Sequence, residues 1–294
     1  MDGIIIINKP KGYTSHDIVN KIRKIYNTKK VGHTGTLDPN ATGVLPILIG
    51  KATKLSDYLT EHNKQYVATL KLGEQRDTGD SEGEIIETCD VPDFVGAHDY
   101  ARITNILKSF LGKQLQVPPM YSAIKINGKK LYEYARAGKV VEVPKREIEI
   151  YNIKLNKIEE SEIEFLVDCS KGTYIRSLCE DIAKKLGTIG FMKELIRTKV
   201  DKFCIENSYA LEEVENNKEN IKIISIEELF EENTKIILDE KNLKLFLNGG
   251  RINVGNDALV VPITKSIATI YDLQNNFIGT GTIINNILKR DIIL

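Results

Sequence analysis

Hydrophobic residues recur along the chain with two different spacings. Residues 4–7 are four isoleucines, and every second position of residues 66–72 is apolar or aromatic, which is the spacing of a strand. Further strands are predicted at 44–49, 148–158 and 163–169. Apolar residues three or four positions apart predict helices at 14–25 with Thr14 or Ser15 as N-cap, around Leu55 and Leu59, and at 100–111, 131–137 and 173–186. The chain therefore mixes strands and helices over most of its length.

The remaining segments differ in character. Residues 74–99 are polar and rich in turn-forming residues, which predicts a long loop with at most one short strand. The acidic stretch 206–235 predicts peripheral helices that lead into a linker. Beyond it, a small β-rich domain is predicted, with strands at 258–261 and 267–271 and turns at 249–250 and 279–281. The predicted domains are therefore 1–235 and 236–294.

Composition limits the classes of protein to consider. Of 294 residues, 41% are hydrophobic and 28% are charged, and no apolar run reaches the roughly 18 residues of a membrane-spanning helix. The N-terminal apolar run is too short for a signal peptide and lacks a basic start. Four cysteines and four histidines show no paired metal-ligand spacing. We expect a globular cytoplasmic protein with free thiols, and no membrane span, metal site or disulfide framework.

The formal net charge is zero, but the charges are unevenly distributed. Residues 1–60 carry nine Lys or Arg against four Asp, a net charge of +5, and residues 113–146 carry eight against two, a net charge of +6. Residues 206–232 hold nine Glu and two Lys, a net charge of −7. Two basic regions are what a polyanionic partner needs, although a charged block is also common on a solvated face.

A glycine-punctuated loop at residues 32–43 presents a single carboxylate, Asp38. The sequence of this loop is GHTGTLDPNATG, and it runs into the apolar residues 44–47. Its three glycines permit positive φ or close backbone approach, and Pro39 directs Asp38 toward an extended backbone. An ordinary Asp-Pro surface turn is the alternative interpretation.

Other chemistries fit the sequence poorly. Gly43, Gly50 and Lys51 superficially match a phosphate-binding loop, but the spacer is apolar and two residues too long. Ala52 also stands where a magnesium-binding hydroxyl is needed. The sequence contains no Gly-x-Ser-x-Gly motif and no paired-histidine metal motif. The loop at 32–43 is therefore the strongest candidate for chemistry.

This loop closely resembles the catalytic loop of the TruB family of tRNA pseudouridine synthases. Residues 64–68, KQYVA, and residues 169–178, CSKGTYIRSL, match two further motifs of that family. The resemblance implies that Asp38 is the nucleophile, that Tyr66 lies against the target uracil and that Arg176 pairs with Asp38. Without the resemblance, Tyr66 fits a core aromatic and Arg176 a surface arginine. We expect the pairing to hold Asp38 ionised well below neutral pH.

The resemblance extends to an RNA-gripping insertion, at about residues 113–146. It implies that four basic residues of this insertion contact phosphates, namely Lys125, Lys129, Lys130 and Arg136. Residues 195–198, LIRT, fit another pattern of the family, although Ile196 stands where a second arginine is common. The resemblance also implies that His33 stacks in the space that the flipped target base vacates.

Over about residues 3–204, the resemblance implies an α+β pseudouridine synthase fold. In that fold a central mixed, largely antiparallel sheet is flanked by helices, and a small β-rich, PUA-like domain that binds RNA follows. The implied reaction is isomerisation of uridine 55 in the T loop of tRNA, without cofactor or metal, after the base is flipped out. The expected partner is the T-arm stem-loop, and we expect a monomer. A non-catalytic RNA-binding or tRNA-folding module and a guide-RNA-dependent synthase are the alternatives.

Overall fold

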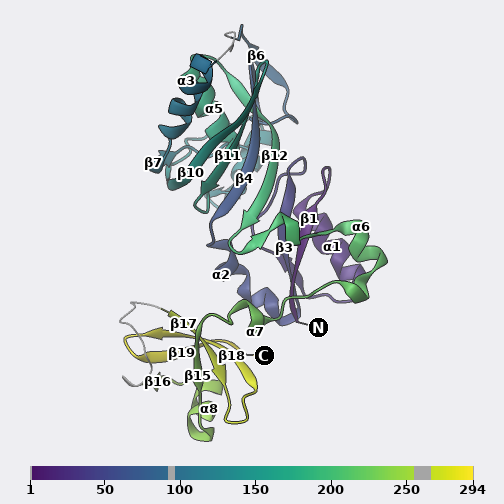
Figure 1. Cartoon of the computed structure of the whole chain (residues 1–294), viewed down its shortest axis with the longest axis vertical. Coiled ribbons are helices and arrows are strands. Elements are labelled where there is room, and N and C mark those ends of the chain that lie inside the picture. The colour runs from purple at the N-terminus through teal and green to yellow at the C-terminus, as the bar shows by residue number, and fades with distance from the viewer. Residues whose placement is uncertain (1, 92–96, 255–265, 294) are drawn as a thin grey trace.

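The computed structural model describes residues 2–91, 97–254 and 266–293. Within these ranges the strands form a ten-stranded sheet, a five-stranded sheet and two small two-stranded sheets. Figure 1 shows the ten-stranded sheet in the upper and middle part of the molecule and the five-stranded sheet below it. The N-terminus lies near the junction between the two.

The large sheet has the strand order β14-β1-β3-β12-β4-β11-β10-β7, with β2 beside β3 and β13 beside β12. The pairs β1–β14 and β3–β12 are parallel, and the other pairs are antiparallel. This confirms the predicted mixed, largely antiparallel sheet. The strands are β1 Gly3–Lys9, β2 Val31–His33, β3 Thr42–Ile49, β4 Lys64–Leu72, β7 Gly112–Gln116, β10 Arg146–Glu159, β11 Glu162–Cys169, β12 Gly190–Val200, β13 Phe203–Cys204 and β14 Tyr209–Ala210.

Helices cover this sheet in two groups. The helices α3 and α5 pack on β10, β4 and β12, whereas α1 and α6 lie beside β1 and β2. The peripheral helices predicted for 206–235 are present as η2, α6, η3 and α7. The helices are α1 Ser15–Ile25, η1 Gly50–Leu55, α2 Ser56–Thr60, α3 Ala97–Lys108, α4 Leu131–Arg136, α5 Ile175–Leu186, η2 Ile205–Asn207, α6 Leu211–Asn216, η3 Lys218–Asn220, α7 Ile226–Leu229 and α8 Glu240–Leu247.

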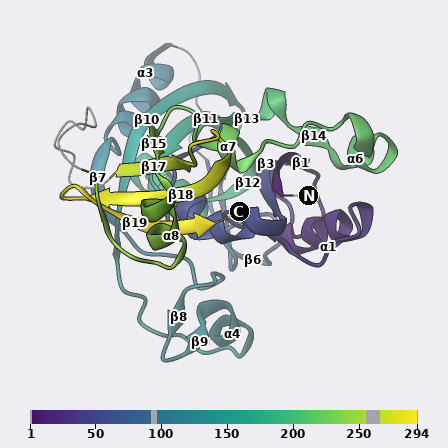
Figure 2. The same ribbon diagram turned by 90° about the horizontal axis from the view of Figure 1, so that it is seen from below.

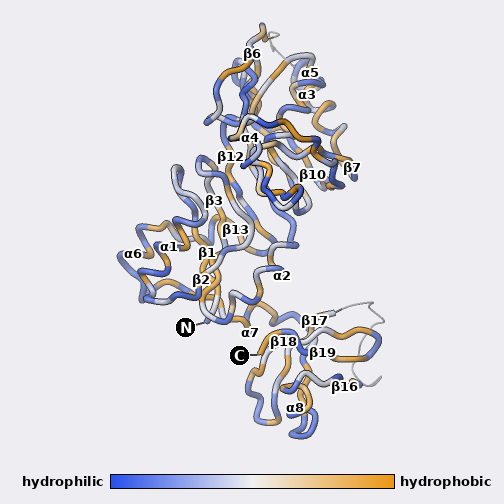
Figure 3. The backbone as a smooth tube through the Cα atoms, turned by 180° about the vertical axis from the view of Figure 1, so that it is seen from behind, coloured by the Kyte–Doolittle hydropathy of each residue, from blue (hydrophilic) through white to orange (hydrophobic). Residues whose placement is uncertain are grey.

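The isoleucine run of β1 is continuous because both faces of the strand are buried. Ile5 and Ile7 pack in the cluster that contains Ile18 of α1, whereas Ile4 and Ile6 pack with residues of η1 and α2. Figure 3 shows hydrophobic segments where β1, β2 and α1 meet. The strand therefore runs through the core, and its last residues bring the chain to the loop that carries Asp38.

Helix α1 begins as the sequence predicts. The side chain of Thr14 accepts a hydrogen bond from the backbone N–H of Asp17, and the Asp17 carboxylate accepts from the backbone N–H of Thr14 at 2.9 Å. This reciprocal pair is a capping box. Ser15 is buried instead, and its Oγ accepts from the backbone N–H of Leu37 at 2.9 Å. The first turn of α1 therefore also holds the loop around Asp38.

Strand β12 was not predicted from the sequence. It contains charged residues such as Glu194 and Arg197, and its register against β4 shifts after Met192 and again after Arg197. Each shift breaks the alternation of apolar and polar positions that marks a strand. The short strand β7 was missed as well. At the centre of the sheet, β12 lies between β3, which follows the loop that carries Asp38, and β4, which carries Tyr66.

The segment 74–99 contains more structure than predicted. It holds the two paired strands β5 Glu74–Arg76 and β6 Ile85–Thr88, whereas at most one strand was expected. Helix α3 begins at Ala97, before the predicted residue 100. Residues 92–96 lie outside the described ranges. The loop between β5 and β6 runs beside β12, because the backbone N–H of Met192 donates to the carbonyl of Gly79 at 3.0 Å.

The segment between β7 and β10 forms a separate small unit. The strands β8 Lys125–Ile126 and β9 Lys129–Lys130 pair through a turn in which Asn127 and Gly128 both have positive φ, and α4 follows directly. Because β7 and β10 are neighbours in the large sheet, this unit is an insertion between two paired strands. Figure 2 shows it projecting away from the rest of the molecule.

The five-stranded sheet confirms a β-rich C-terminal region, in the order β15-β17-β18-β19-β16. The turn at 249–250 and the strand at 267–271 are confirmed, but the turn at 279–281 is wrong. These residues lie inside β18, where a Cβ on Gly279 would collide with the backbone of Ile292, so the glycine marks a close strand approach. The strand predicted at 258–261 lies outside the described residues. The strands are β15 Thr234–Ile237, β16 Ile252–Asn253, β17 Ser266–Tyr271, β18 Phe277–Ile284 and β19 Ile287–Ile293.

Candidate active site

The loop that carries Asp38 joins β2 to β3 and is held on both sides of the carboxylate. Gly35 has φ 75° and Gly43 has φ 102°, values of the left-handed region that favours glycine. A Cβ on Gly43 would also collide with the backbone of β12. Ser15 donates to the carbonyl of Leu37 at 3.2 Å and accepts from its N–H at 2.9 Å. The loop is therefore a constrained segment, in agreement with its glycine pattern.

Asp38 faces Arg176, which lies in the first turn of α5. The guanidinium Nε lies 3.2 Å from Asp38 Oδ2, and Nη2 lies 3.4 Å from Oδ1. Two N–H groups thus face two carboxylate oxygens, the arrangement that fixes a carboxylate most firmly. Arg176 also donates to the carbonyls of Thr78 at 3.1 Å and Tyr121 at 2.9 Å. The implied pair is present, and it gives Arg176 a partner at a helix end whose dipole disfavours a cation.

A second carboxylate, Asp80, also lies beside Arg176. Its Oδ2 is 3.6 Å from Arg176 Nη1, while its Oδ1 accepts from the hydroxyl of Thr78 at 2.7 Å and from the backbone N–H of Glu82 at 3.1 Å. Asp80 is buried. The sequence gives no signal for Asp80, because it is one of several acidic residues in a turn-rich loop.

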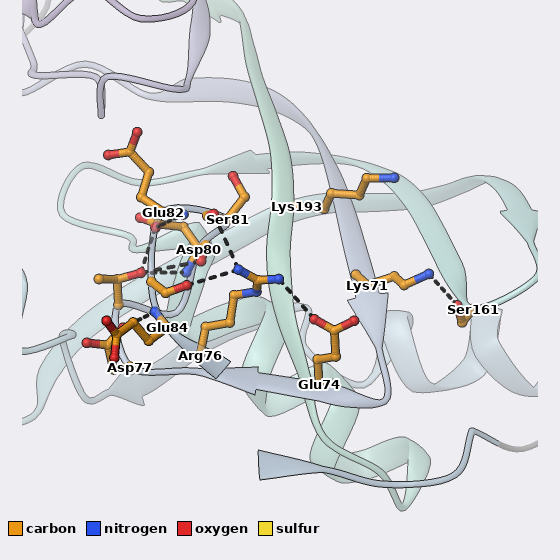
Figure 4. A network of polar contacts seen from close by, with 12 residues as sticks. Lys71, Glu74, Arg76, Asp77, Asp80, Ser81, Glu82, Glu84, Ser161 and Lys193 are labelled. Atoms are coloured by element: carbon orange, nitrogen blue, oxygen red, sulfur yellow. Dashed lines mark hydrogen bonds and ion pairs between the residues drawn. The ribbon is translucent and has the colours of Figure 1, made fainter. Parts of the chain in front are cut away.

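The loop around Asp80 is held by its own polar contacts, which Figure 4 shows. Arg76 donates to the carbonyl of Gly83 at 2.9 Å and pairs with Glu74 at 3.0 Å. The carboxylate of Asp77 accepts from the backbone N–H of Glu84 at 2.9 Å. These contacts make the loop a fixed support, so that Asp80 and the Thr78 carbonyl reach Arg176 from a defined position.

Burial raises the pKa of Asp38 above its ordinary value of 3.8. The Arg176 guanidinium opposes this shift, Asp80 adds to it, and Lys9 opposes it. The pairing with Arg176 acts to lower this pKa, as expected, but burial outweighs it and the net shift is upward. The reason is that α5 and the neighbouring loops remove water from the carboxylate and place a second carboxylate near it. Even so, the Asp38 side chain remains 36% exposed, so an incoming ligand can reach it.

A pocket of about 720 Å³ opens beside Asp38. Tyr66 lies on β4 at its wall, and burial raises the pKa of the Tyr66 phenol. The pocket therefore brings together Asp38, Tyr66 and Arg176 from three distant segments. The rest of its lining comes from the Asp38 loop, the end of α2, the insertion and the turn after β11, and includes Thr36, Lys64, Tyr121, Tyr132, Lys171 and Arg197.

Three buried cations lie around this pocket and were not identified from the sequence as site residues. Burial lowers the pKa of Lys9 to about 8 and that of Lys64 to about 8. Lys9 Nζ donates to the carbonyl of Pro39 at 2.9 Å, and Lys64 Nζ donates to the carbonyl of Thr60 at 2.7 Å. The third cation is Arg197. Arg197 donates to the carbonyls of Val44 and Gly35, so all three cations bind backbone carbonyls at or near the pocket wall.

Comparison with known proteins assigns the chain to a family. Residues 23–175 match the TruB family pseudouridylate synthase (N terminal domain), and residues 176–231 match the tRNA pseudouridylate synthase B C-terminal domain. The chain belongs to the TruB family. It is 44% identical over 283 residues to the tRNA pseudouridine synthase B of Caldanaerobacter subterraneus subsp. tengcongensis, with 96% of this chain and 95% of that one covered.

A second curated relative of this TruB family member is the tRNA pseudouridine synthase B of Clostridium tetani, 46% identical over 284 residues, with 96% and 95% of the two chains covered. Among solved structures, the fold is similar to the crystal structure of a Cbf5-Nop10-Gar1 complex. The TM-score is 0.70 at 28% identity, and 96% of this chain and 78% of that chain are covered. The likeness to an H/ACA RNP bound to a substrate RNA, with TM-score 0.71 at 24% identity over 99% and 85% of the chains, shows the fold alone.

His33 lies outside the pocket lining in the described part of this TruB family chain. It is the last residue of β2, opposite Ile47 of β3. Burial lowers the pKa of His33, and the neighbouring Arg197 and His16 lower it further, which favours the neutral ring. Its Nδ1 is buried without a hydrogen-bond partner among the described residues. The stacking role that the TruB resemblance implies for His33 stays a prediction.

The four basic residues that the TruB resemblance implies for RNA binding all lie on the projecting insertion. Three of them are exposed, and Lys130 is half-buried. The cationic groups of Lys130 and Arg136 lie 5.3 and 5.4 Å from the ring of Tyr132, which lines the pocket. None of the four forms an ion pair with a carboxylate of the described residues. The insertion therefore carries available positive charge next to the pocket.

The pattern at residues 195–198 lies on β12. Ile196 is 36% exposed on β12, whereas its neighbour Arg197 is buried, so Arg197 is not available to a phosphate.

In residues 2–91, 97–254 and 266–293, no group of three or more His, Cys, Asp or Glu is arranged to hold a metal ion. No helix in these ranges is long and apolar enough to cross a membrane.

Proposed function

We propose that the chain isomerises uridine 55 in the T loop of tRNA to pseudouridine. The observation that carries this proposal is the contact between Asp38 and Arg176 at a pocket that Tyr66 also lines. The pocket volume of about 720 Å³ falls in the range of small-molecule sites, roughly 300–1,000 Å³. The names of curated relatives at 44–46% identity support tRNA as the substrate, because each is a tRNA pseudouridine synthase B.

In the proposed reaction, the bond between N1 of uracil and C1′ of ribose breaks, the base turns, and C5 bonds to the same C1′. C5 loses its proton and N1 gains one, so the atoms balance within one nucleoside and no oxidation occurs. Asp38 is the nucleophile, attacking the sugar or the base and leaving again within the cycle. The proposed route therefore uses no cofactor.

The other side chains bind and orient the uridine. Tyr66 offers an aromatic face to the uracil, and Arg176 fixes the direction of the Asp38 carboxylate. The base reaches the pocket by flipping out of its stack, at a cost of a few kcal/mol. His33 fills the space that the base leaves. The bound RNA covers the pocket, so the detached base is kept from water until it is rejoined.

The insertion supplies the contacts that hold the RNA. Phosphates of the T-arm stem-loop are bound by Lys125, Lys129, Lys130 and Arg136. The unit that carries these residues projects away from the rest of the molecule (Figure 2). We assign residues 1–235 to the catalytic domain, including the insertion at about 113–146, and residues 236–294 to a PUA-like RNA-binding domain. The protein acts as a monomer in the cytoplasm.

Two other functions make different demands on the same residues. A non-catalytic RNA-binding or tRNA-folding module needs the basic insertion but has no use for Asp38 held beside Arg176. A guide-RNA-dependent synthase needs guide RNA and accessory proteins. The chain is 28% identical to a chain of the solved Cbf5-Nop10-Gar1 complex, whereas it is 44–46% identical to the tRNA pseudouridine synthases B. The higher identity over nearly the full length supports the stand-alone enzyme.

The release of tritium from C5-labelled uridine in a T-arm hairpin separates these functions. C5 loses its hydrogen only if the base is rejoined through that carbon. The purified chain, without guide RNA or partner protein, is expected to release tritium with multiple turnovers. A binding module and a guide-dependent synthase both bind the hairpin without release. Full binding without release would therefore remove the proposal.

A further inference from the structure

Arg197 is a fully buried charge at the pocket that has no carboxylate partner among the described residues. Its side chain is 1% exposed and is among the largest fully buried side chains of the described chain. Burial lowers its pKa, and the neighbouring Tyr66 opposes that shift. Burying a guanidinium without a paired carboxylate costs free energy, because carbonyl dipoles replace its water only in part. The hydrogen bonds that Arg197 makes in the folded protein must offset this cost.

Those hydrogen bonds go to both ends of the loop that carries Asp38. Arg197 Nε donates to the carbonyl of Val44 at 2.7 Å, and Nη2 donates to the carbonyl of Gly35 at 3.0 Å. Gly35 lies three residues before Asp38, and Val44 lies six residues after it. One planar group thus ties the two ends of the loop together.

The same side chain also lies beside Tyr66, and its positive charge acts to lower the pKa of the Tyr66 phenol against the larger effect of burial. The sheet explains this arrangement. Strand β12 lies between β3 and β4, and Arg197 stands opposite Gly43 on one side and Tyr66 on the other. Gly43 leaves room for the backbone of Arg197, since a Cβ there would collide with it. The loop and the aromatic wall therefore share one support.

We infer that Arg197 is a positioning residue, which holds Asp38 at a fixed place relative to Tyr66 by binding both ends of the Asp38 loop from the strand position opposite Tyr66. This inference rests on the proposed function. The rate of a reaction in an enzyme pocket is sensitive to such geometry, since a misplacement of about 1 Å can cost about 10²-fold. Arg197 also lines the pocket, but it acts on Asp38 through the loop.

The substitution Arg197→Lys tests this role while keeping the positive charge. A lysine ammonium is a single point donor, so it lacks the planar fork that spans the two carbonyls. The matched control is Arg23→Lys. Arg23 also donates to a backbone carbonyl, that of Val31 at 3.2 Å, and to Asn20 Oδ1 at 3.1 Å, but it lies on α1 outside the pocket lining.

Three measurements are made on the full-length variants with a C5-tritiated T-arm hairpin: the single-turnover rate at saturating RNA, the Kd for RNA, and the pH profile of the rate. We expect Arg197→Lys to lower the single-turnover rate about 10- to 100-fold with Kd unchanged within about two-fold. The acid limb of the profile keeps its midpoint, because the charges that act on Asp38 come from Arg176, Asp80 and Lys9. Arg23→Lys changes none of these values.

Three outcomes would overturn the inference. They are an unchanged rate in Arg197→Lys, a loss confined to Kd, and a failure of Arg197→Lys to fold while Arg23→Lys folds. The last result would assign Arg197 to global stability. If the wild-type protein itself releases no tritium, the proposed function fails instead, so the two failures are distinguishable.

Discussion

The protein carries two sets of cations close to one pocket, and the sets differ in burial and in hydrogen-bond partners. Lys9, Lys64 and Arg197 are buried, and they donate to backbone carbonyls of the pocket wall. The basic residues of the insertion stand on a projecting hairpin and helix, without carboxylate partners in the described chain. The first set has exchanged water for protein dipoles, whereas the second keeps its charge available to a ligand.

This difference teaches how charge near a site is to be interpreted. A buried cation fixes the backbone around it, and its removal should change the rate of the chemical step. An exposed cation attracts phosphates, and its removal should change affinity and salt dependence. In both cases the residue type is the same, and only burial and partners separate the roles. Four predictions test this difference between buried and exposed cations. The first concerns Asp38, the carboxylate near the buried cations.

Asp38→Asn should have the largest effect. The amide keeps the shape of the side chain but is no nucleophile, so the single-turnover rate should fall by about 10⁴-fold or more. Affinity for the T-arm hairpin should stay within about two-fold, because the insertion is unchanged. The rate is measured by tritium release and the affinity by filter binding. A variant that retains a tenth of the wild-type rate would contradict the role of Asp38.

Asp80→Asn should have the next largest effect, a loss of about 10- to 100-fold in the rate. Asp80 helps to orient Arg176, and its charge raises the pKa of Asp38. Removing that charge lowers the pKa of Asp38, so the acid limb of the pH–rate profile should move to lower pH. Asp77→Asn in the same loop is the matched control, since Asp77 is exposed and binds only within the loop. A limb that moves to higher pH would contradict the assigned charge effect.

Replacing Lys129 and Arg136 by alanine should affect binding only. Each lost phosphate contact should reduce the slope of log K against log salt by about 0.7 to 0.9, and the rate at saturating RNA should stay within about two-fold. Lys218→Ala, in the acidic stretch, is the control for loss of one positive charge. Binding titrations at several salt concentrations provide the test. A fall in the saturated rate with an unchanged salt slope would erase the distinction between the two sets.

The smallest expected effect concerns stability. The pKa of Asp38 is raised in the folded protein, so the stability linked to this group is present at low pH and is lost as pH rises through the folded-state pKa. Ionised Asp38 therefore disfavours folding at pH 7, and Asp38→Asn should raise the Tm there by up to about 2 °C. The difference should vanish at acid pH. Thermal melts at both pH values check the sign, and a lower Tm at pH 7 would reverse it.

Most of the fold could be predicted from the sequence where local patterns are strong. The run of β1, the capping box at Thr14 and the alternation of β4 all correspond to observed elements. Strand β12 could not be found in this way, because its two register shifts and its charged residues break the alternation. The turn predicted at 279–281 failed because a glycine also serves where two strands approach closely.

The site was predictable only in part, for a similar reason. The loop motif and the resemblance to the TruB family pointed to Asp38, Tyr66 and Arg176, and these residues do line one pocket. Asp80 acts through a residue distant in sequence and has no local signal, whereas the LIRT pattern contains Arg197 but does not indicate its contacts with the Asp38 loop. The direction of the Asp38 pKa shift depends on how much water the fold removes, and that is a property of the assembled pocket.

The most direct test of the central claim is tritium release from T-arm hairpins that carry a single C5-labelled uridine, either in the T loop or in the stem. With one hairpin per enzyme molecule, the account predicts release approaching one equivalent from the loop position and none from the stem. It also predicts no release from either position with Asp38→Asn. Release from the stem uridine, or release from the loop that does not depend on Asp38, would contradict it.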